Sequence, residues 1–259
     1  MDRKKILSAV QNDEDKLVIS KIIDTAEFAE NKNCVKITGF LNGHQIMLAK
    51  KCLSEYEAGY EFYGGYEEFE RGILLCYPSY YTPQKEDYPI SIIYARAKNG
   101  ARLSHRDYTG AVLNLGISRD KIGDIVVFDD GAYIVCISNI AEYIVNNINK
   151  VGKAGVELSV SDCAGIKVPP RKFKEIKASV SSLRLDSLIA EALGMSRSEA
   201  SSLITKGDVR VNWEVKCKND FKPTEGDIFS VHGHGRILLY RIGGLSKKGR
   251  IFVTLKRYI

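Results

Sequence analysis

Apolar residues recur at helical and strand spacing along the chain and divide it into short elements. Leu17, Ile19, Ile22, Ile23, Ala26 and Ala29 form a helical apolar face after a cap at Asn12 or Asp13. A second helix is predicted over 43–53. The following segment, GYEFYGGYEEFERGILLCYPSYY at 59–81, has strand-like ends around a Gly-Gly centre. Residues 1–83 are therefore predicted to form a small mixed N-terminal domain.

Residues 84–165 show a more regular order of elements. PISIIYARA, DIVVFDD, AYIVCIS and GVELSVS read as strands, and helices are predicted over 105–115 and 140–150. Asp130-Gly131 lies between two apolar runs and predicts a hairpin turn whose central residues both have positive φ. The order β-α-β-β-α-β is that of ferredoxin-like domains and of RNA-recognition motifs. The middle domain is therefore predicted to be ferredoxin-like, or RRM-like.

A basic segment with two prolines, IKVPPRKFKEIKAS, predicts an extended linker over 166–180. After it, leucines and isoleucines at helical spacing predict two short helices, separated by Gly194 and ended by Gly207. Ser196 and Glu199 form a capping box at the start of the second helix. Val209, Val211 and Trp213 alternate with polar residues and predict a strand. The fold class is therefore α+β, with a C-terminal domain of two short helices and a small sheet at 181–259.

Composition narrows the class of protein. The chain has 259 residues, 44% hydrophobic and 27% charged, as in an ordinary globular protein. No stretch resembles a secretory signal or spans a bilayer, so we expect a cytoplasmic protein without membrane insertion, and a monomer. None of the six cysteines forms a C-x-x-C pair, which indicates reduced thiols. Cys217, His232 and His234 lack a suitably spaced fourth ligand, so no metal or cofactor is expected.

The net charge of +6 is unevenly distributed along the chain. Residues 167–259 hold 19 Lys and Arg against 9 Asp and Glu, a net of +10. The other 166 residues hold 19 basic and 23 acidic residues, a net of −4. This division indicates a nucleic-acid-facing C-terminal end and a separate, mildly acidic body.

Basic and small polar residues of the two C-terminal helices are the candidates for RNA contact. Helix N-termini offer N–H groups to phosphates, and arginine binds phosphate with two hydrogen bonds. We expect Asp186 to start a helix or to position an arginine rather than to catalyse a reaction, and no catalytic residue is predicted. The predicted RNA-binding residues are Arg184, Ser187, Ser196, Arg197, Ser198, Lys206, Arg210, Asn212 and Lys216.

Two resemblances give these patterns a context. Residues 183–215, with Arg-Leu-Asp at 184–186, Ser-Arg-Ser-Glu-Ala at 196–200 and Lys-Gly-x-Val-x-Val-Asn at 206–212, resemble the ribosomal-protein-S-four-like (alpha-L) RNA-binding domain. YGGYEEFERGILLCYPSYY, HRDYTGAVLNLGISRDKIGDIVVFDDGAYIVC and INKVGKAGV, followed by that domain, resemble the bacterial YlmH family. The family is also called ribosome-associated quality-control protein P-two. The first 55 residues match it only loosely.

The family resemblance implies a non-enzymatic, ribosome-associated factor. Such a factor binds ribosomal RNA of the large subunit and peptidyl-tRNA on a stalled ribosome, and it assists C-terminal tailing of the nascent chain, together with a tailing factor. Carried onto this sequence, the RNA grip falls on Arg184, Arg197, Ser198 and Lys206. A secondary RNA contact is expected at His105 and Arg106.

Two alternatives remain open from the sequence. One is an RNA-modifying enzyme with an appended RNA-binding domain and an active site within residues 1–165, where GYEFYGGYEEFER and the His-Arg-Asp segment lie. The chain lacks the glycine-rich loop of a methyltransferase. It also lacks the catalytic domain of a pseudouridine synthase and that of a tyrosyl-tRNA synthetase. The other is a scaffold linked to cell division, in which the acidic body recruits a protein partner.

Overall fold

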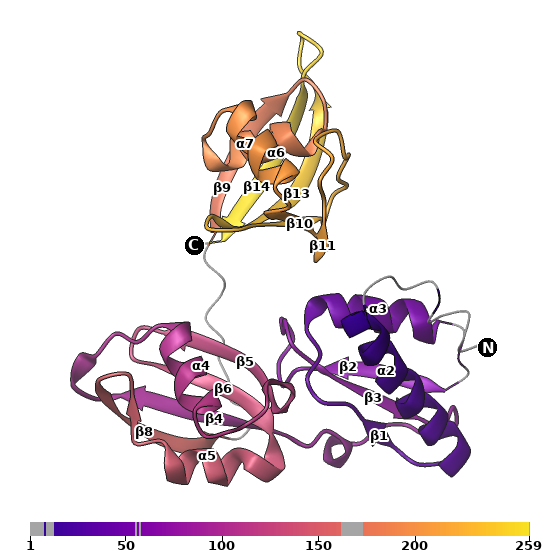
Figure 1. Cartoon of the computed structure of the whole chain (residues 1–259), viewed down its shortest axis with the longest axis vertical. Helices are drawn as coiled ribbons and strands as arrows, with labels where there is room; N and C mark the ends of the chain where they lie inside the picture. Colours follow the sequence, from indigo (N-terminus) through magenta and orange to yellow (C-terminus); the bar gives the residue numbers. More distant parts are fainter. Residues whose placement is uncertain (1–7, 9–12, 55, 57, 162–172, 259) are drawn as a thin grey trace. The chain divides into compact units, whose positions relative to one another are not determined.

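The computed structural model divides the chain into two units, Met1–Pro169 and Pro170–Ile259 (Figure 1). It describes residues 8, 13–54, 56, 58–161 and 173–258. Each unit has sheets and a hydrophobic core of its own, as expected for an α+β protein. No helix in the described ranges is long and apolar enough to cross a membrane.

The first unit begins with two helices packed on a small antiparallel sheet. Helices α2 (Asp13–Lys32) and α3 (Gly43–Leu53) share a core with the strands β1 (Lys36–Ile37), β2 (Gly59–Tyr63) and β3 (Ile73–Tyr77), in the order β1-β3-β2. Both predicted helices are confirmed. Leu17, however, is 61% exposed, because a turn of 100° per residue places it opposite Ile22, Ile23 and Ala26.

The second sheet of this unit has the predicted β-α-β-β-α-β order, with one additional two-residue strand, β7 (Lys150–Val151), between the second helix and the last strand. It contains β4 (Ile90–Ala97), β5 (Ile122–Phe128), β6 (Gly131–Ile137), β7 and β8 (Ala154–Ser161). The spatial order is β5-β6-β4-β8-β7, and all pairs are antiparallel. Helices α4 (His105–Leu113) and α5 (Ala141–Asn147) cover one face, as Figure 1 shows. The ferredoxin-like prediction is therefore confirmed.

The hairpin turn in this sheet differs from the prediction by one residue. Phe128 pairs with Gly131, so the two turn residues are Asp129 and Asp130. None of these positions has a positive φ. Gly131 is required for a different reason, since a Cβ there would collide with the carbonyl oxygen of Ala95 on β4.

A shared apolar cluster and a hydrogen-bonded carboxylate join the two sheets of the first unit. Phe40 and Ile73 of the first sheet region pack against Ile90, Ile92 and Val135 of the second. Asp124 on β5 accepts hydrogen bonds from three groups of the 66–71 segment, namely the hydroxyl of Tyr66 at 2.7 Å, the N–H of Glu70 at 2.6 Å and the N–H of Arg71 at 3.1 Å. The two sheets therefore form one unit, while the predicted boundary at residue 83 stays a prediction.

The side chains of Arg71 and Arg119 complete this joint by donating to main-chain oxygens. Arg71 donates to the carbonyl oxygens of Phe40, Arg119 and Ile122 at 3.1–3.2 Å. Arg119 donates to those of Ile122 and Gly123 at 2.8 and 3.2 Å. Arg119 and Asp124, whose side chains make these bonds, belong to the segment that resembles the YlmH family most specifically, HRDYTGAVLNLGISRDKIGDI at 105–125. Part of that resemblance therefore has a structural cause.

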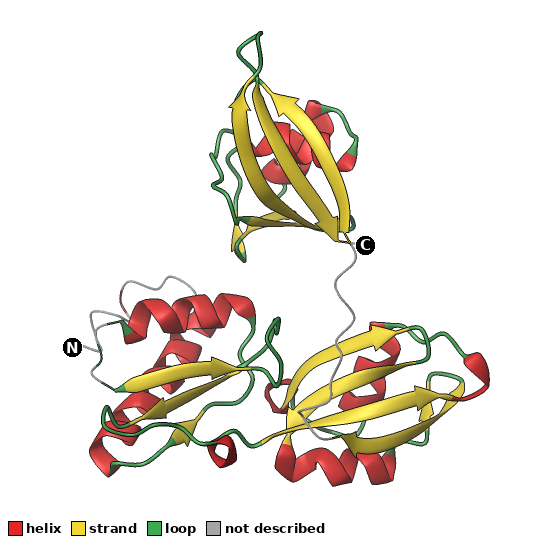
Figure 2. Cartoon of the chain, turned by 180° about the vertical axis from the view of Figure 1, so that it is seen from behind, coloured by secondary structure: helices red, strands yellow, loops and turns green. Residues whose placement is uncertain are grey.

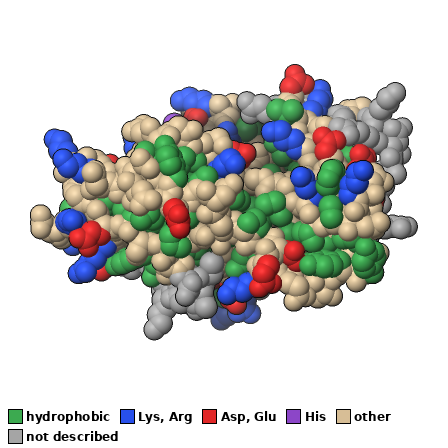
Figure 3. Space-filling model, turned by 90° about the horizontal axis from the view of Figure 1, so that it is seen from below, with side chains coloured by type: hydrophobic (Ala, Val, Ile, Leu, Met, Phe, Trp, Pro, Cys, Tyr) green, Lys and Arg blue, Asp and Glu red, His purple; other side chains and the backbone are tan. Residues whose placement is uncertain are grey.

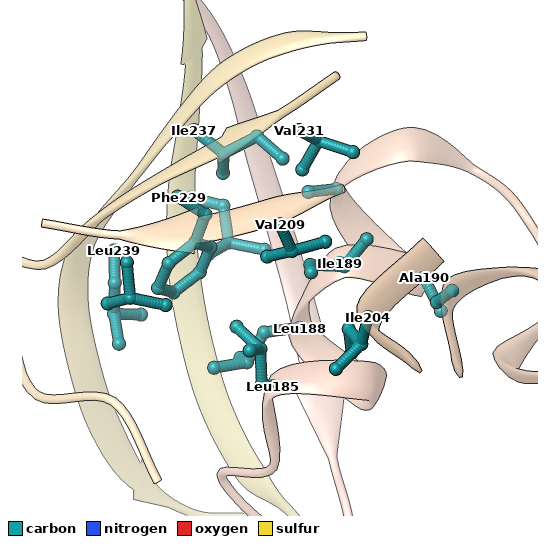
Figure 4. Packing of buried hydrophobic residues seen from close by; sticks show 14 of the residues in the cluster. Leu185, Leu188, Ile189, Ala190, Ile204, Val209, Phe229, Val231, Ile237 and Leu239 are labelled. Atoms are coloured by element: carbon teal, nitrogen blue, oxygen red, sulfur yellow. The ribbon is translucent and has the colours of Figure 1, made fainter. Parts of the chain in front are cut away.

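The C-terminal unit is a six-stranded antiparallel sheet with two helices on one face (Figure 2). Its strands lie in the order β11 (Glu214–Val215), β10 (Val209–Val211), β12 (Ile228–Val231), β13 (Gly235–Leu245), β14 (Ile251–Tyr258) and β9 (Phe173–Val180). The helices are α6 (Leu185–Leu193) and α7 (Arg197–Thr205). Their apolar faces meet Val209, Phe229 and Leu239 in one buried cluster (Figure 4).

The linker predicted over 166–180 is wrong for its second half. Residues 173–180 form strand β9, which pairs with β14 along its full length. Glu175 and Lys177 alternate with Ile176, Ala178 and Val180, which pack against the core. A half-buried strand with a charged outer side explains this composition. Residues 166–172 lie outside the described part of the chain.

Candidate nucleic-acid interface

The two helices of the C-terminal unit are joined by a three-residue turn with clear capping signals. Gly194 ends α6 in the left-handed conformation, at φ 66° and ψ 35°, a region that glycine adopts without strain. Ser196 then caps α7, because its hydroxyl accepts from the N–H of Glu199 and the Glu199 carboxylate accepts from the N–H of Ser196. The predicted capping box is confirmed, and it fixes the N-terminus of α7 beside the start of α6.

Asp186 lies at the centre of this helix pair. It is 5% exposed, and its Oδ1 accepts from the N–H of Ser187 at 2.8 Å. Arg184 donates to both carboxylate oxygens, with Nε at 3.1 Å from Oδ1 and Nη2 at 3.2 Å from Oδ2. Arg197, eleven residues later on α7, donates to Oδ2 at 2.9 Å. Asp186 thus contacts both arginines, and the expectation that it positions them stays a prediction.

The ion pairs shift the pKa values of this cluster in opposite directions. Burial alone would raise the pKa of Asp186, but the hydrogen bonds and charges of Arg184 and Arg197 outweigh it and hold that pKa below the usual value. The same contact raises the pKa of Arg184. Side-chain exposures of 37% for Arg184 and 55% for Arg197 leave both guanidinium groups accessible to a ligand. Each can offer its remaining N–H groups to phosphate.

The predicted RNA-binding residues fall into two groups in the structure. Arg184 and Arg197 meet at Asp186, and Ser198, Lys206 and Arg210 are exposed on α7, at its C-cap and on β10. Ser196 is exposed, but its hydroxyl serves as the helix cap. RNA contact by these residues stays a prediction.

Three other predicted contact residues are held in the fold. The prediction that Ser187 is available for RNA contact is wrong, because this residue is 5% exposed and its hydroxyl faces Asp186. Asn212 binds Asp227 Oδ1 at 2.6 Å through its amide nitrogen, and its oxygen accepts from the N–H of Ile228 at 3.0 Å. Lys216 lies 2.7 Å from the carboxylate of Glu214. Short polar side chains often form hydrogen bonds with nearby groups of the protein itself, and their position in the sequence does not reveal this.

Trp213 was predicted to continue the strand but forms a turn instead. Val211 pairs with Glu214, so Asn212 and Trp213 are the turn residues, with φ values of 46° and 75°. Both positive φ values are those of a type I′ hairpin turn, which asparagine tolerates and tryptophan rarely adopts. The guanidinium of Arg236 lies 4.9 Å from the centroid of the Trp213 ring. A half-buried indole is thus presented on a hairpin next to Arg210.

His105 and Arg106 form the first turn of α4, after the Ser104 cap. Both side chains are exposed. Although the side chain of His105 is exposed at the surface, desolvation by neighbouring protein atoms, followed by the charge of Arg119, lowers its pKa, which favours the neutral imidazole. A neutral ring attracts phosphate less than an imidazolium does. Arg106 therefore carries the positive charge of the expected secondary contact.

Three aromatic rings on the second sheet were not identified from the sequence. Tyr94 on β4 lies directly opposite Tyr133 on β6, and Phe128 on β5 completes the cluster, with ring centroids 5.0–6.0 Å apart. Helices α4 and α5 cover the opposite face. A shallow hollow of about 340 Å³ is lined by these rings with Ser159 and Ser161. The sequence contained a signal for this cluster, because its aromatic residues lie in the predicted strands of an RRM-like sheet. In such domains, aromatic residues on the open face of the sheet stack with RNA bases.

One face of the molecule carries charges of both signs. On the face that Figure 3 shows, Lys and Arg side chains lie among Asp, Glu and hydrophobic ones. Among the residues that the structure describes, no group of three or more His, Cys, Asp or Glu is placed to hold a metal ion.

Comparisons with known proteins match both candidate regions. A family model described as "Putative RNA-binding domain in YlmH" matches residues 83–164, and the S4 domain model matches residues 183–229. The chain is 29% identical, over 245 residues, to "Ribosome-associated protein quality control protein P2" of Bacillus subtilis (strain 168). This alignment covers 94% of the chain and 95% of the relative. The resemblance to the YlmH family is confirmed.

A solved structure supports the same relationship to YlmH. The structure titled "Cell division protein ylmH from Streptococcus pneumoniae" aligns with a TM-score of 0.52 and 27% sequence identity. The alignment covers 60% of this chain and 95% of that one. The aromatic cluster lies in the region that the RNA-binding-domain model matches, and the Arg184–Asp186–Arg197 cluster lies in the region that the S4 model matches.

Proposed function

We propose that the protein is a non-enzymatic, ribosome-associated RNA-binding factor that acts in the quality control of stalled nascent chains. Its ligands are ribosomal RNA of the large subunit and the tRNA that carries the stalled chain, and it assists C-terminal tailing. Two matched RNA-binding domains and the ribosome-associated relative support this role. Within the chain, the observation that most supports the proposal is that two accessible arginines, Arg184 and Arg197, are bound to the buried carboxylate of Asp186.

The physical argument rests on preorganisation. A free arginine loses side-chain entropy when it binds phosphate, whereas Arg184 and Arg197 are already held in one place by a shared carboxylate. The N-terminus of α7 adds N–H groups and a positive dipole end beside Arg197. Recognition of structured RNA by shape and backbone suits this arrangement, because side chains cannot read the deep major groove of an RNA helix.

The test is co-sedimentation with large ribosomal subunits in a gradient. The double variant Arg184→Ala/Arg197→Ala should leave the subunit fraction, and the binding of the wild-type protein should weaken steeply as salt rises. A matched control removes two exposed lysines of the first unit, Lys85→Ala/Lys153→Ala, and should sediment like the wild type. A folded Arg184→Ala/Arg197→Ala variant that still co-sediments fully would refute the proposed site.

A scaffold role in cell division is the second candidate, because the similar solved structure has "Cell division protein" in its title. Affinity purification with and without nuclease separates the two functions. Partners that persist after nuclease treatment favour the scaffold, and partners lost with RNA favour the ribosomal factor. The enzyme alternative is weakened by the joint around Asp124, since the titratable groups that meet there bind main-chain atoms.

A further inference from the structure

Most of the positive charge of the C-terminal unit lies outside the matched S4 domain. Residues 183–229 contain seven Lys and Arg and eight Asp and Glu, a net of −1. Residues 173–180 and 230–258 contain nine Lys and Arg, and the sole acidic residue in these two ranges is Glu175. These ranges include β9, β13 and β14. The basic character that suggested RNA binding therefore belongs mainly to this part of the sheet.

Strand register places three of these nine cations, Lys177, Arg241 and Lys256, on the face of the sheet opposite the helices. Leu255 pairs with Ile176 and Leu239, and Val253 pairs with Ala178, all of which point toward α6 and α7. The positions between them must point the other way. Figure 2 shows this helix-free side of the sheet. We call it the outer face, and it consists of Glu175, Lys177, Ser179, Tyr240, Arg241, Phe252, Thr254 and Lys256.

Aromatic rings are interleaved with the cations on the outer face. The Lys256 ammonium lies 3.3 Å from the centroid of the Tyr240 ring and 5.7 Å from that of Phe173. Tyr240 and Phe252 are 51% and 50% exposed, which is unusual for large rings with no covering element. A shallow hollow of about 330 Å³ lies along β9 and β14, lined by Lys177, Ala178, Ser179, Phe252, Val253 and Thr254.

The charge of this face is strongly positive. Glu175 lies 3.4 Å from the ammonium of Lys177, so its charge is partly compensated. Arg250 donates from Nε to the hydroxyl of Ser179 at 3.0 Å, which holds it at the margin of the hollow. Lys247 and Lys248 lie in the adjoining turn between β13 and β14. A positive surface with half-exposed rings is the arrangement that binds a single-stranded nucleic acid, with cations on phosphates and rings under bases.

We propose that the outer face of β9, β13 and β14 binds a single-stranded stretch of RNA and is a second RNA contact of the C-terminal unit. The proposal rests on the proposed function, since it assumes that the protein binds RNA. Lys177 and Arg241 contact phosphates, and Phe252 and Tyr240 stack with bases. The helix pair on the opposite side of the sheet contacts a different RNA segment.

The first test measures binding of a fluorescein-labelled 12-nucleotide oligouridine to the full-length protein across a salt series. Lys177→Gln/Arg241→Gln removes two exposed cations without touching the core. Affinity should fall roughly tenfold, and the slope of log affinity against log salt should fall by about 1.4, as expected for two lost phosphate contacts on a single strand. The control Lys85→Gln/Lys153→Gln removes the same charge from the first unit and should bind like the wild type.

The outcomes separate this proposal from the proposed function. Wild-type protein that binds neither the oligonucleotide nor ribosomal subunits would refute both. Wild-type binding that is lost in Arg184→Ala/Arg197→Ala but unchanged in Lys177→Gln/Arg241→Gln would overturn the outer face alone. A nuclease-resistant protein partner lost in Lys177→Gln/Arg241→Gln, with unchanged RNA affinity, would also overturn it.

A second measurement does not depend on any substitution. Ultraviolet crosslinking of a 4-thiouridine oligonucleotide, followed by mass spectrometry of peptides, should label the peptide that contains Phe252 and the peptide that contains Tyr240. Crosslinks confined to residues of α6 and α7 would contradict the proposal. Thermal unfolding within a few degrees of the wild type confirms that each variant is folded.

Discussion

Replacing Asp186 by Asn separates the role of its charge from that of its shape. The amide retains the size of the carboxylate and one oxygen that can accept from the N–H of Ser187. It loses the negative charge that faces Arg184 and Arg197. Charged hydrogen bonds contribute about 1.5–3 kcal/mol each, but both guanidinium groups are partly exposed to solvent and the neutral amide is cheaper to bury. We expect Asp186→Asn to lower the free energy of unfolding by about 1–2 kcal/mol at pH 7.

The pH dependence gives the sign of this effect. The pKa of Asp186 is lower in the folded state, so its contribution is present in full above the unfolded pKa of about 3.9. The contribution is lost as pH falls through the folded pKa. Urea unfolding at pH values from 7 to 3 should therefore show wild type and Asp186→Asn converging at the acid end. A difference that persists or grows below pH 4 would show that the charge is not the cause.

The RNA affinity of Asp186→Asn tests preorganisation directly. The variant keeps both arginines and gains one unit of net positive charge, so simple electrostatics predicts tighter binding. If Asp186 orients the arginines, binding should instead weaken roughly tenfold, because both side chains must then be ordered by the RNA. The salt slope should stay near the wild-type value, whereas Arg184→Ala/Arg197→Ala should lower it. Tighter binding of Asp186→Asn would refute the positioning role.

Three further predictions concern the first unit. Asp124→Ala removes an acceptor of three hydrogen bonds and should destabilise the protein by about 2–4 kcal/mol in urea unfolding, whereas Asp129→Ala in the exposed turn should change it little. Since desolvation by neighbouring protein atoms and the charge of Arg119 lower the pKa of His105, its imidazole should titrate below pH 6.5 by nuclear magnetic resonance; a midpoint above 6.5 would contradict this. Tyr94→Ala/Tyr133→Ala should reduce crosslinking of residues 90–137 to unpaired nucleotides while leaving Arg184-dependent binding unchanged.

Local signals in the sequence were sufficient for most helices and for the middle domain. The Gly43–Leu53 helix, the Ser196 capping box and the β-α-β-β-α-β order each depend on neighbouring residues alone, and each is confirmed. Strand β9 could not be predicted in this way, because its partner β14 lies about 80 residues later and its own sequence is largely polar and charged. Pairing with the distant strand β14 buries one side of β9, and the composition of β9 alone does not indicate this burial.

The candidate site shows the same limit for individual side chains. The meeting of Arg184 with Arg197 follows from the capped turn at Gly194 and Ser196, which the sequence predicts. The burial of Ser187 and the bonds of Asn212 depend on which backbone groups lie nearby in three dimensions. A list of polar residues from the sequence therefore combines candidate RNA contacts with side chains that bind the protein's own backbone.

The charge of the C-terminal unit is divided unequally between the S4 segment and the basic strands, and this division predicts different roles for the two in RNA binding. The S4 segment has a net charge of −1, so its attraction for RNA is local and depends on the placement of a few arginines. The remaining strands are strongly basic, so they attract RNA over a Debye length of about 10 Å and at any sequence. Removing cations from the outer face should thus slow association and reduce salt dependence, whereas Asp186→Asn should mainly speed dissociation. Stopped-flow kinetics of the two variants distinguishes these effects, and equal changes in association rate would show that the two sides act as one electrostatic surface.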